Sequence, residues 1–148
     1  MRRFMLLVVV LTVGFAPAPL PRADRRGQSA EITLGSFQGR WRVVSVMTSR
    51  ANGQHVPFKW WVTHVRVEGN RWDLLSNDSP VSSRQFSIDV TKKPAHLNLD
   101  DGGSKGFGLI RLHDGQVQVL YVWGDEKARA ASFDPAPEGH WLITLQRE

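Results

Sequence analysis

Histidine side chains are the residues of this sequence with the most obvious capacity to bind a metal ion. There are five of them, and no two are spaced i, i+2 on a strand or i, i+4 on a helix. They are His55, His64, His96, His113 and His140. A zinc site would therefore have to collect its ligands from separate segments of the chain. We interpret the histidines as solvated surface residues and predict no metal site.

Other reactive side chains also lack the spacing that a reaction needs. The run Asp100-Asp101-Gly102-Gly103 has neither the alternating oxygen ligands nor the closing Glu of a calcium loop. No serine lies in a Gly-x-Ser-x-Gly elbow, and the absence of cysteine excludes thiol catalysis and thiolate metal ligation. Acidic residues on strand ends could pair as acid and base, but any β-barrel offers such pairs. We predict that the protein is not an enzyme and uses no cofactor.

Large aromatic side chains are more informative, because they are suited to binding apolar molecules. Phe58, Trp60 and Trp61 fall within four residues of one connector. Three rings on a short connector cannot all point inward, so part of this group is expected at the surface. Exposed apolar patches usually mark interaction sites, and Trp is favoured as a binding anchor. The alternative is a lid whose rings cap the protein's own core.

Short β-strands must position these aromatics, because apolar and polar side chains alternate with a period of two along much of the chain. A polar loop is predicted at 77–83 and a long loop at 124–139, and no helix of normal length is predicted after the N-terminal apolar run. Eight strands joined by tight turns form an antiparallel meander, and closing it removes both sheet edges. The predicted fold is an all-β, eight-stranded antiparallel up-and-down barrel. Its strands are expected at about residues 40–48, 62–68, 71–76, 85–90, 96–99, 106–112, 116–123 and 140–147.

The same alternation places five aromatic rings on the inner face, namely Trp41, Trp72, Phe86, Tyr121 and Trp141. Burying one such ring removes about 150–250 Å² from water. An eight-stranded barrel is only just wide enough for its own side chains or one small ligand, so a packed core is favoured over a roomy pocket. The candidate ligand-binding residues are Trp72, Phe86 and Tyr121, together with Phe58, Trp60 and Trp61. Gly39, Trp41 and Trp141 are predicted to be structural, with Trp41 as a buried plug at one end.

The first 23 residues have the layout of a signal peptide. Arg2 and Arg3 precede an apolar run that extends from Phe4 to Phe15. Ala16-Pro17-Ala18 and Pro21-Arg22-Ala23 are alternative cleavage sites. An apolar run of about a dozen residues is shorter than the roughly twenty that span a bilayer, so we expect no stable membrane anchor after cleavage.

Cleavage leaves a flexible leader over 24–35 and one domain over 36–148. It removes three arginines and no acids, which leaves 16 basic and 14 acidic side chains and a net charge of +2. So small and scattered a charge predicts no nucleic-acid partner. We expect a monomer that is exported to the periplasm or the extracellular medium.

Several stretches of the domain resemble a small lipocalin-like domain family that is abundant in planctomycete bacteria and has no assigned activity. They are Gln38–Ser45, Asn52–Gln54 with Val56-Pro57, Lys92–Leu99 and Gly139–Glu148. In this order and spacing they cover essentially the whole domain. The resemblance implies a calycin-type barrel, usually on an exported protein, and it implies no catalytic residues.

Gly39-Arg40-Trp41 is also similar to the Gly-x-Trp of the first strand in lipocalins proper, where the Trp closes one end of the barrel. The sequence departs from the family pattern at Phe58–Trp61, and a proline expected after Arg129 is missing. Our first hypothesis is a non-enzymatic, lipocalin-like binding module for a small apolar or amphipathic molecule. The alternative is a protein-interaction or structural module of the cell envelope with a filled barrel.

Overall fold

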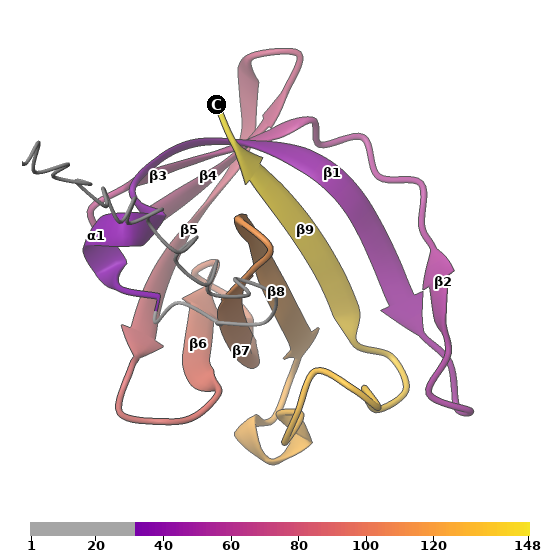
Figure 1. Ribbon diagram of the computed structural model, residues 1–148. Helices are drawn as coiled ribbons and strands as arrows, with labels where there is room; N and C mark the ends of the chain where they lie inside the picture. Colours follow the sequence, from indigo (N-terminus) through magenta and orange to yellow (C-terminus); the bar gives the residue numbers. More distant parts are fainter. Residues whose placement is uncertain (1–31) are drawn as a thin grey trace, which may run out of the picture.

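The computed structural model describes residues 32–148 (Figure 1), so the predicted signal peptide and most of the predicted leader lie outside the described residues. Within this range one short helix, α1 (Leu34–Phe37), precedes nine strands, and a single 3-10 turn, η1 (Glu126–Ala128), follows the eighth of them. The strands are β1 (Gly39–Ser49), β2 (His55–Pro57), β3 (His64–Glu68), β4 (Arg71–Ser76), β5 (Ser79–Asp89), β6 (Ala95–Asp100), β7 (Lys105–His113), β8 (Gln116–Trp123) and β9 (Trp141–Arg147).

Eight of the strands close into one antiparallel barrel. From β3 to β9 each strand pairs with the next, β1 pairs with β3, and β9 returns to pair with β1. Figure 1 shows β1 and β9 side by side along most of their length. In this closing pair Val43 lies opposite Leu145 and Val46 opposite Ile143, with a β-bulge between Val43 and Ser45. The predicted eight-stranded antiparallel barrel is confirmed.

The short strand β2 is an addition that the sequence did not predict. On the edge of β1 away from β9, β3 pairs only with residues 39–42 and β2 pairs only with residues 47–49. The chain then runs from β2 back along β1 to the start of β3 (Figure 1). The middle of β1 therefore faces an irregular connector on this edge, where a continuous sheet would have placed another strand.

Apolar side chains from all eight barrel strands fill the interior, as the two-residue alternation predicts. The fully buried ones include Val65, Trp72, Leu97, Val119 and Leu145. Because successive residues of a strand point to opposite faces, one face of each strand supplies this core.

The segment that precedes β1 closes one end of the barrel. Phe37 is completely buried, and its ring centre lies 5.8 Å from Trp41, 5.7 Å from Trp72 and 5.6 Å from Phe86. The indole nitrogen of Trp41 donates to the carbonyl oxygen of Phe37 (2.9 Å). Thr33 caps the helix by accepting a hydrogen bond from the backbone of Ser36 (3.0 Å). Trp41 is 3% exposed, but Phe37 is the ring that contacts all of the other three, Trp41, Trp72 and Phe86.

A second apolar core lies on the outer face of β7, β8 and β9. Leu109 and Leu120 are buried there beneath Ala130, Phe133 and Ala136 of the loop that follows β8. Part of each of these strands therefore carries buried apolar side chains on both faces.

Arg129 fastens that loop to the barrel. Its guanidinium donates to the carbonyl oxygens of Leu97 (3.0 Å) and Gly108 (2.8 Å) and to the side chain of Asn98 (2.7 Å). Its side chain is only 7% exposed. Three hydrogen bonds to β6 and β7 compensate for burying this charge.

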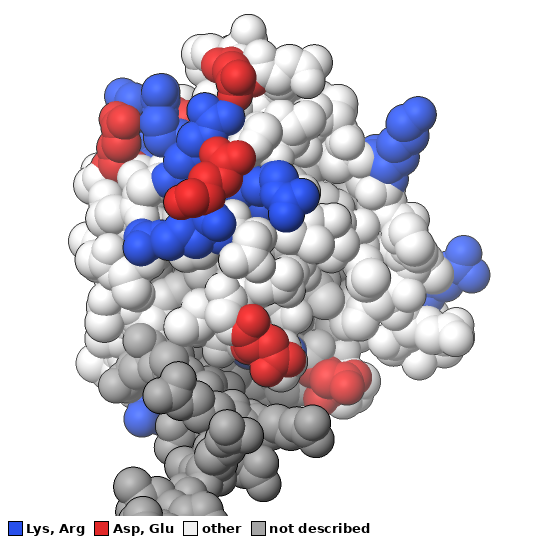
Figure 2. Space-filling model, turned by 45° about the horizontal axis from the view of Figure 1, so that its top comes forward, with Lys and Arg blue, Asp and Glu red and all other residues white. Residues whose placement is uncertain are grey.

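Paired charges cover the outer surface where β1, β3 and β4 meet, and Figure 2 shows basic and acidic side chains interleaved there. Asp73 is buried at the centre of this group and accepts hydrogen bonds from Ser83 (2.7 Å), Arg66 (3.0 Å) and Arg71 (3.0 Å). Burial by itself raises the pKa of Asp73, but these three hydrogen bonds outweigh it and the pKa is lowered.

Two local predictions need correction. Residues 77–83 were predicted as a polar loop, but β5 already begins at Ser79 after a tight turn in which Asn77 and Asp78 have positive φ angles. The serines of this strand pair with β4 through their backbones, so the strand needs no apolar alternation. The strand predicted at about 85–90 ends at Asp89, and Val90 lies beyond it and is 40% exposed.

Candidate ligand-binding cleft

A cleft of about 640 Å³ lies between the middle of β1 and the connector that joins β2 to β3. It exists because β1 parts from β3 after Arg42 and does not meet β2 until Met47. Residues 42–47 of β1 and residues 57–60 and 62–64 of the connector line it. The wall is largely apolar, with Val43, Val46 and Val62 among its residues.

The three connector aromatics take different positions at this cleft. Phe58 lines it, is 42% exposed and packs edge-to-face on Trp141 with ring centres 4.5 Å apart. Trp60 also lines the cleft and is half-buried against the barrel core. Trp61 is 59% exposed beside it. The group is thus part lid and part exposed surface.

The bulge in β1 adds to the exposed apolar surface. Val44 lines the cleft and is 45% exposed, because the extra residue of the bulge lies outside the regular alternation. The cleft also carries two exposed basic side chains, Arg42 and Lys59. Apolar walls with a basic rim suit a molecule that has an apolar body and a polar or anionic end.

The other three candidate ligand-binding residues lie elsewhere. Trp72, Phe86 and Tyr121 are at most 5% exposed and belong to the packed interior. The rings of Trp72 and Phe86 are in edge contact with Phe37, which occupies the space between them and the barrel end. Phe58 and Trp60 therefore line the cleft, whereas Trp61 does not line it and Trp72, Phe86 and Tyr121 lie in the packed interior.

The residues predicted to be structural lie at the two ends of the barrel. Gly39 has a φ angle of +110°, a conformation that side-chain-bearing residues rarely adopt. The guanidinium of Arg147 lies 5.1 Å from the ring centre of Trp41 and donates to the carbonyl oxygen of Gln38 (2.6 Å). Trp141 is half-buried against the core and supports Phe58.

The histidines are less exposed than predicted. His140 is 2% exposed, and its Nε2 atom donates to the carbonyl oxygen of Ala128 (2.9 Å). It holds the start of β9 to the loop, so the prediction of a solvated surface residue is wrong for His140. His64 is half-buried and contacts Glu148 (3.1 Å). Among residues 32–148, no three His, Cys, Asp or Glu side chains lie close enough together to hold a metal ion.

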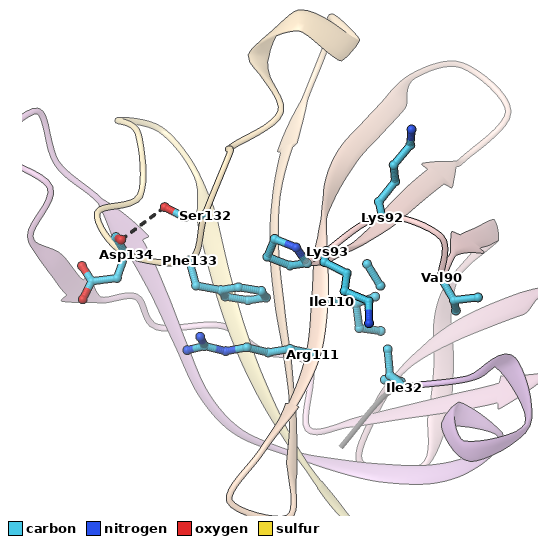
Figure 3. Close-up of a pocket in the computed structure, with 11 residues that line it drawn as sticks. Ile32, Val90, Lys92, Lys93, Ile110, Arg111, Ser132, Phe133 and Asp134 are labelled. Carbon is cyan, nitrogen blue, oxygen red and sulfur yellow. Dashed lines mark hydrogen bonds between the residues drawn. The ribbon is translucent and has the colours of Figure 1, made fainter. Parts of the chain in front are cut away.

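A second pocket, of about 580 Å³, lies between the β5–β6 connection, β7 and the loop after β8. Figure 3 shows the Phe133 ring over the side chain of Arg111, whose guanidinium points toward Asp134. Arg111 also donates to Gln118 (2.8 Å), and burial lowers its pKa. The sequence analysis missed this pocket because its residues come from four separate segments. The aromatic ring of this second pocket, Phe133, is 4% exposed, whereas Phe58 of the first cleft is 42% exposed.

Comparison with known proteins adds no homologue to this description. No protein-family model matches the sequence, and neither curated proteins nor solved structures show significant similarity to it. Within the described part of the chain, no helix has the length and apolarity needed to cross a membrane.

Proposed function

We propose that this protein is an exported, non-enzymatic binding module that holds a small apolar or amphipathic molecule in the β1 cleft. The observation that carries the proposal is the placement of Phe58 and Trp60 on the wall of a cleft of about 640 Å³. Exposing large rings at a concave site costs folding free energy that a bound apolar molecule would recover. The signal-peptide layout of residues 1–23 supports export.

A second candidate function is a protein-interaction or structural module of the cell envelope. One observation favours it: Val44, Phe58 and Trp61 are all more than 40% exposed near the cleft, whereas the barrel interior is packed. An aromatic patch over a filled barrel would suit a partner surface as well as a small ligand.

Binding of the neutral fluorescent probe N-phenyl-1-naphthylamine to the full chain tests the first function. We expect Phe58→Ala to weaken probe binding at least tenfold, because Phe58 supplies an exposed wall of the cleft. Val81→Ala is the matched control, because Val81 is 40% exposed on β5 and lies away from the cleft lining. A wild-type protein that does not bind the probe, or equal binding by Phe58→Ala, would refute the first function.

The stability of two further variants separates lid from patch. Trp60→Ala should lower the free energy of unfolding by several kcal/mol, since this ring packs on the core. Trp61→Ala should change it by less than about 1 kcal/mol, since this ring is 59% exposed. If Trp61→Ala leaves probe binding intact but abolishes assembly with an envelope protein, the second function is favoured.

A further inference from the structure

Three large apolar side chains protrude together beside the β1 cleft. Val44 is 45% exposed, Phe58 is 42% exposed and Trp61 is 59% exposed. Val44 and Phe58 line the cleft, and Trp61 directly follows the lining residue Trp60 in the chain. Because a whole aromatic side chain presents about 150–250 Å², the three leave roughly 300 Å² of apolar surface in water. An exposed apolar patch of this kind usually marks an interaction surface.

Basic side chains flank this patch, since residues 32–67 include no Asp or Glu while Arg and Lys recur among them. Figure 2 shows isolated basic side chains and no acidic ones along the right-hand edge, on the side where Figure 1 places β2. Arg42 and Lys59 line the cleft, are exposed, and form no ion pair within the described part of the chain. Glu148 contacts the lining residue His64 (3.1 Å) but is also paired with Arg40. The patch therefore complements an anionic surface.

The size and composition of the patch favour a lipid bilayer over a protein partner. A specific protein interface buries about 800 Å² on each partner and somewhat over half of that area is apolar, which is more than these three side chains supply. Lys is depleted in protein interfaces, whereas Trp and basic side chains gather where a bilayer meets water. A bilayer needs no matching shape, and its anionic headgroups attract cations that lack an acidic partner.

We propose that these three apolar side chains insert shallowly into an anionic lipid bilayer, while Arg42 and Lys59 contact its headgroups. Lys59 directly follows Phe58, and its long side chain can extend to the headgroups while the neighbouring rings enter the apolar boundary. The contact is reversible adsorption to a membrane surface, because so small an apolar area does not anchor a protein permanently. The inference goes beyond ligand binding and does not rest on it, since Trp61, the most exposed ring, does not line the cleft.

A fluorescent label at position 61 of the full chain tests the docking. The sequence has no cysteine, so Trp61→Cys provides a single thiol for a nitrobenzoxadiazole label. Vesicles of equimolar phosphatidylcholine and phosphatidylglycerol should shift its emission to shorter wavelength, because the label leaves water. Val81→Cys carries the same label as the matched control and should show no shift, because Val81 is 40% exposed on β5 and away from the cleft lining. Adding Lys59→Gln to Trp61→Cys should raise the lipid needed for the shift about fivefold, and vesicles of phosphatidylcholine alone should raise it at least tenfold.

The docking is refuted if the label at position 61 responds to anionic vesicles no more than the label at position 81. It is also refuted if phosphatidylcholine vesicles act equally well, or if Lys59→Gln changes nothing, because the basic side chains would then contribute nothing. A shift that grows with protein concentration in the absence of lipid would place a second copy over the patch and overturn the inference. Failure of the β1 cleft is a separate outcome, because binding of the naphthylamine probe is measured without lipid and depends on Phe58.

Discussion

Replacing Phe37 with alanine is the most direct test of how the barrel end is closed. The side chain is completely buried and contacts the rings of Trp41, Trp72 and Phe86. Phe→Ala changes in cores cost about 3–5 kcal/mol, and each lost aromatic pair is worth roughly 0.5–1.5 kcal/mol beyond area burial. Because the three neighbouring rings are fixed by their own strands, they cannot collapse into the space. We expect a loss of about 4–5 kcal/mol from the free energy of unfolding.

Guanidinium denaturation followed by tryptophan fluorescence measures this loss, since Trp41 and Trp72 report directly on the site. Leu34→Ala is the matched control, because Leu34 lies in the same helix and is 46% exposed. It should cost less than about 1 kcal/mol. A four-residue helix has no stability of its own, so Phe37→Ala should also release α1 from the barrel. If Phe37→Ala is as stable as Leu34→Ala, the end of the barrel is closed by something other than this ring.

Two further predictions concern acid stability and a backbone contact. In the folded protein the pKa of Asp73 lies below its ordinary value of 3.8, so the stability from its hydrogen bonds should be complete above about pH 5 and should be lost as the pH falls below 3.8. Urea midpoints measured between about pH 2 and 6 should therefore decline toward acid pH, and Asp73→Asn should reduce that decline. An unchanged decline in Asp73→Asn would contradict the assignment. Gly108→Ala should destabilise the barrel by about 3 kcal/mol or prevent folding, because its Cβ would lie 2.2 Å from the carbonyl oxygen of Leu120. Gly103→Ala is the control and should melt near the wild-type temperature, because the nearest atom to its Cβ would be 3.9 Å away.

The sequence was most informative where one face of a strand is apolar and the other polar. The predicted bounds of β4 and β8, 71–76 and 116–123, agree with the structure because alternation and a turn residue mark both ends. The start of β5 was missed because its serines carry no hydrophobic signal and the strand is held by backbone pairing with β4. Strand β2 was missed because three residues are too few to show any period.

The candidate site was predictable in part. The crowding of Phe58, Trp60 and Trp61 in one connector was visible in the sequence, and the structure places Phe58 and Trp60 on the lining of the β1 cleft and leaves Trp61 exposed. The cleft itself was not predictable, because it depends on where β1 parts from β3. Alternation assigned Trp72 to the inner face, but only the strand register places Arg84 opposite Trp72.

The second apolar core, beneath the loop after β8, was likewise not predictable from the sequence. Leu120 alternates with Tyr121, which was assigned to the inner face, and nothing in its own strand indicates that the outer face would be covered. The available signal was the apolar set of Ala130, Phe133 and Ala136 in an otherwise polar loop. Such a set predicts that the loop packs against the barrel, but it does not indicate which strand the loop covers.

Closure of the barrel between β1 and β9 has a kinetic consequence. Val43 and Leu145 pair across about one hundred residues of chain, so the entropy of closing that loop must be lost before their contacts form. Until β9 docks, β1 and β8 both present unpaired backbone groups along an open edge. A newly made chain therefore passes through an open sheet with exposed edges, and β9, the strand that closes the barrel, protects those edges from pairing with other copies.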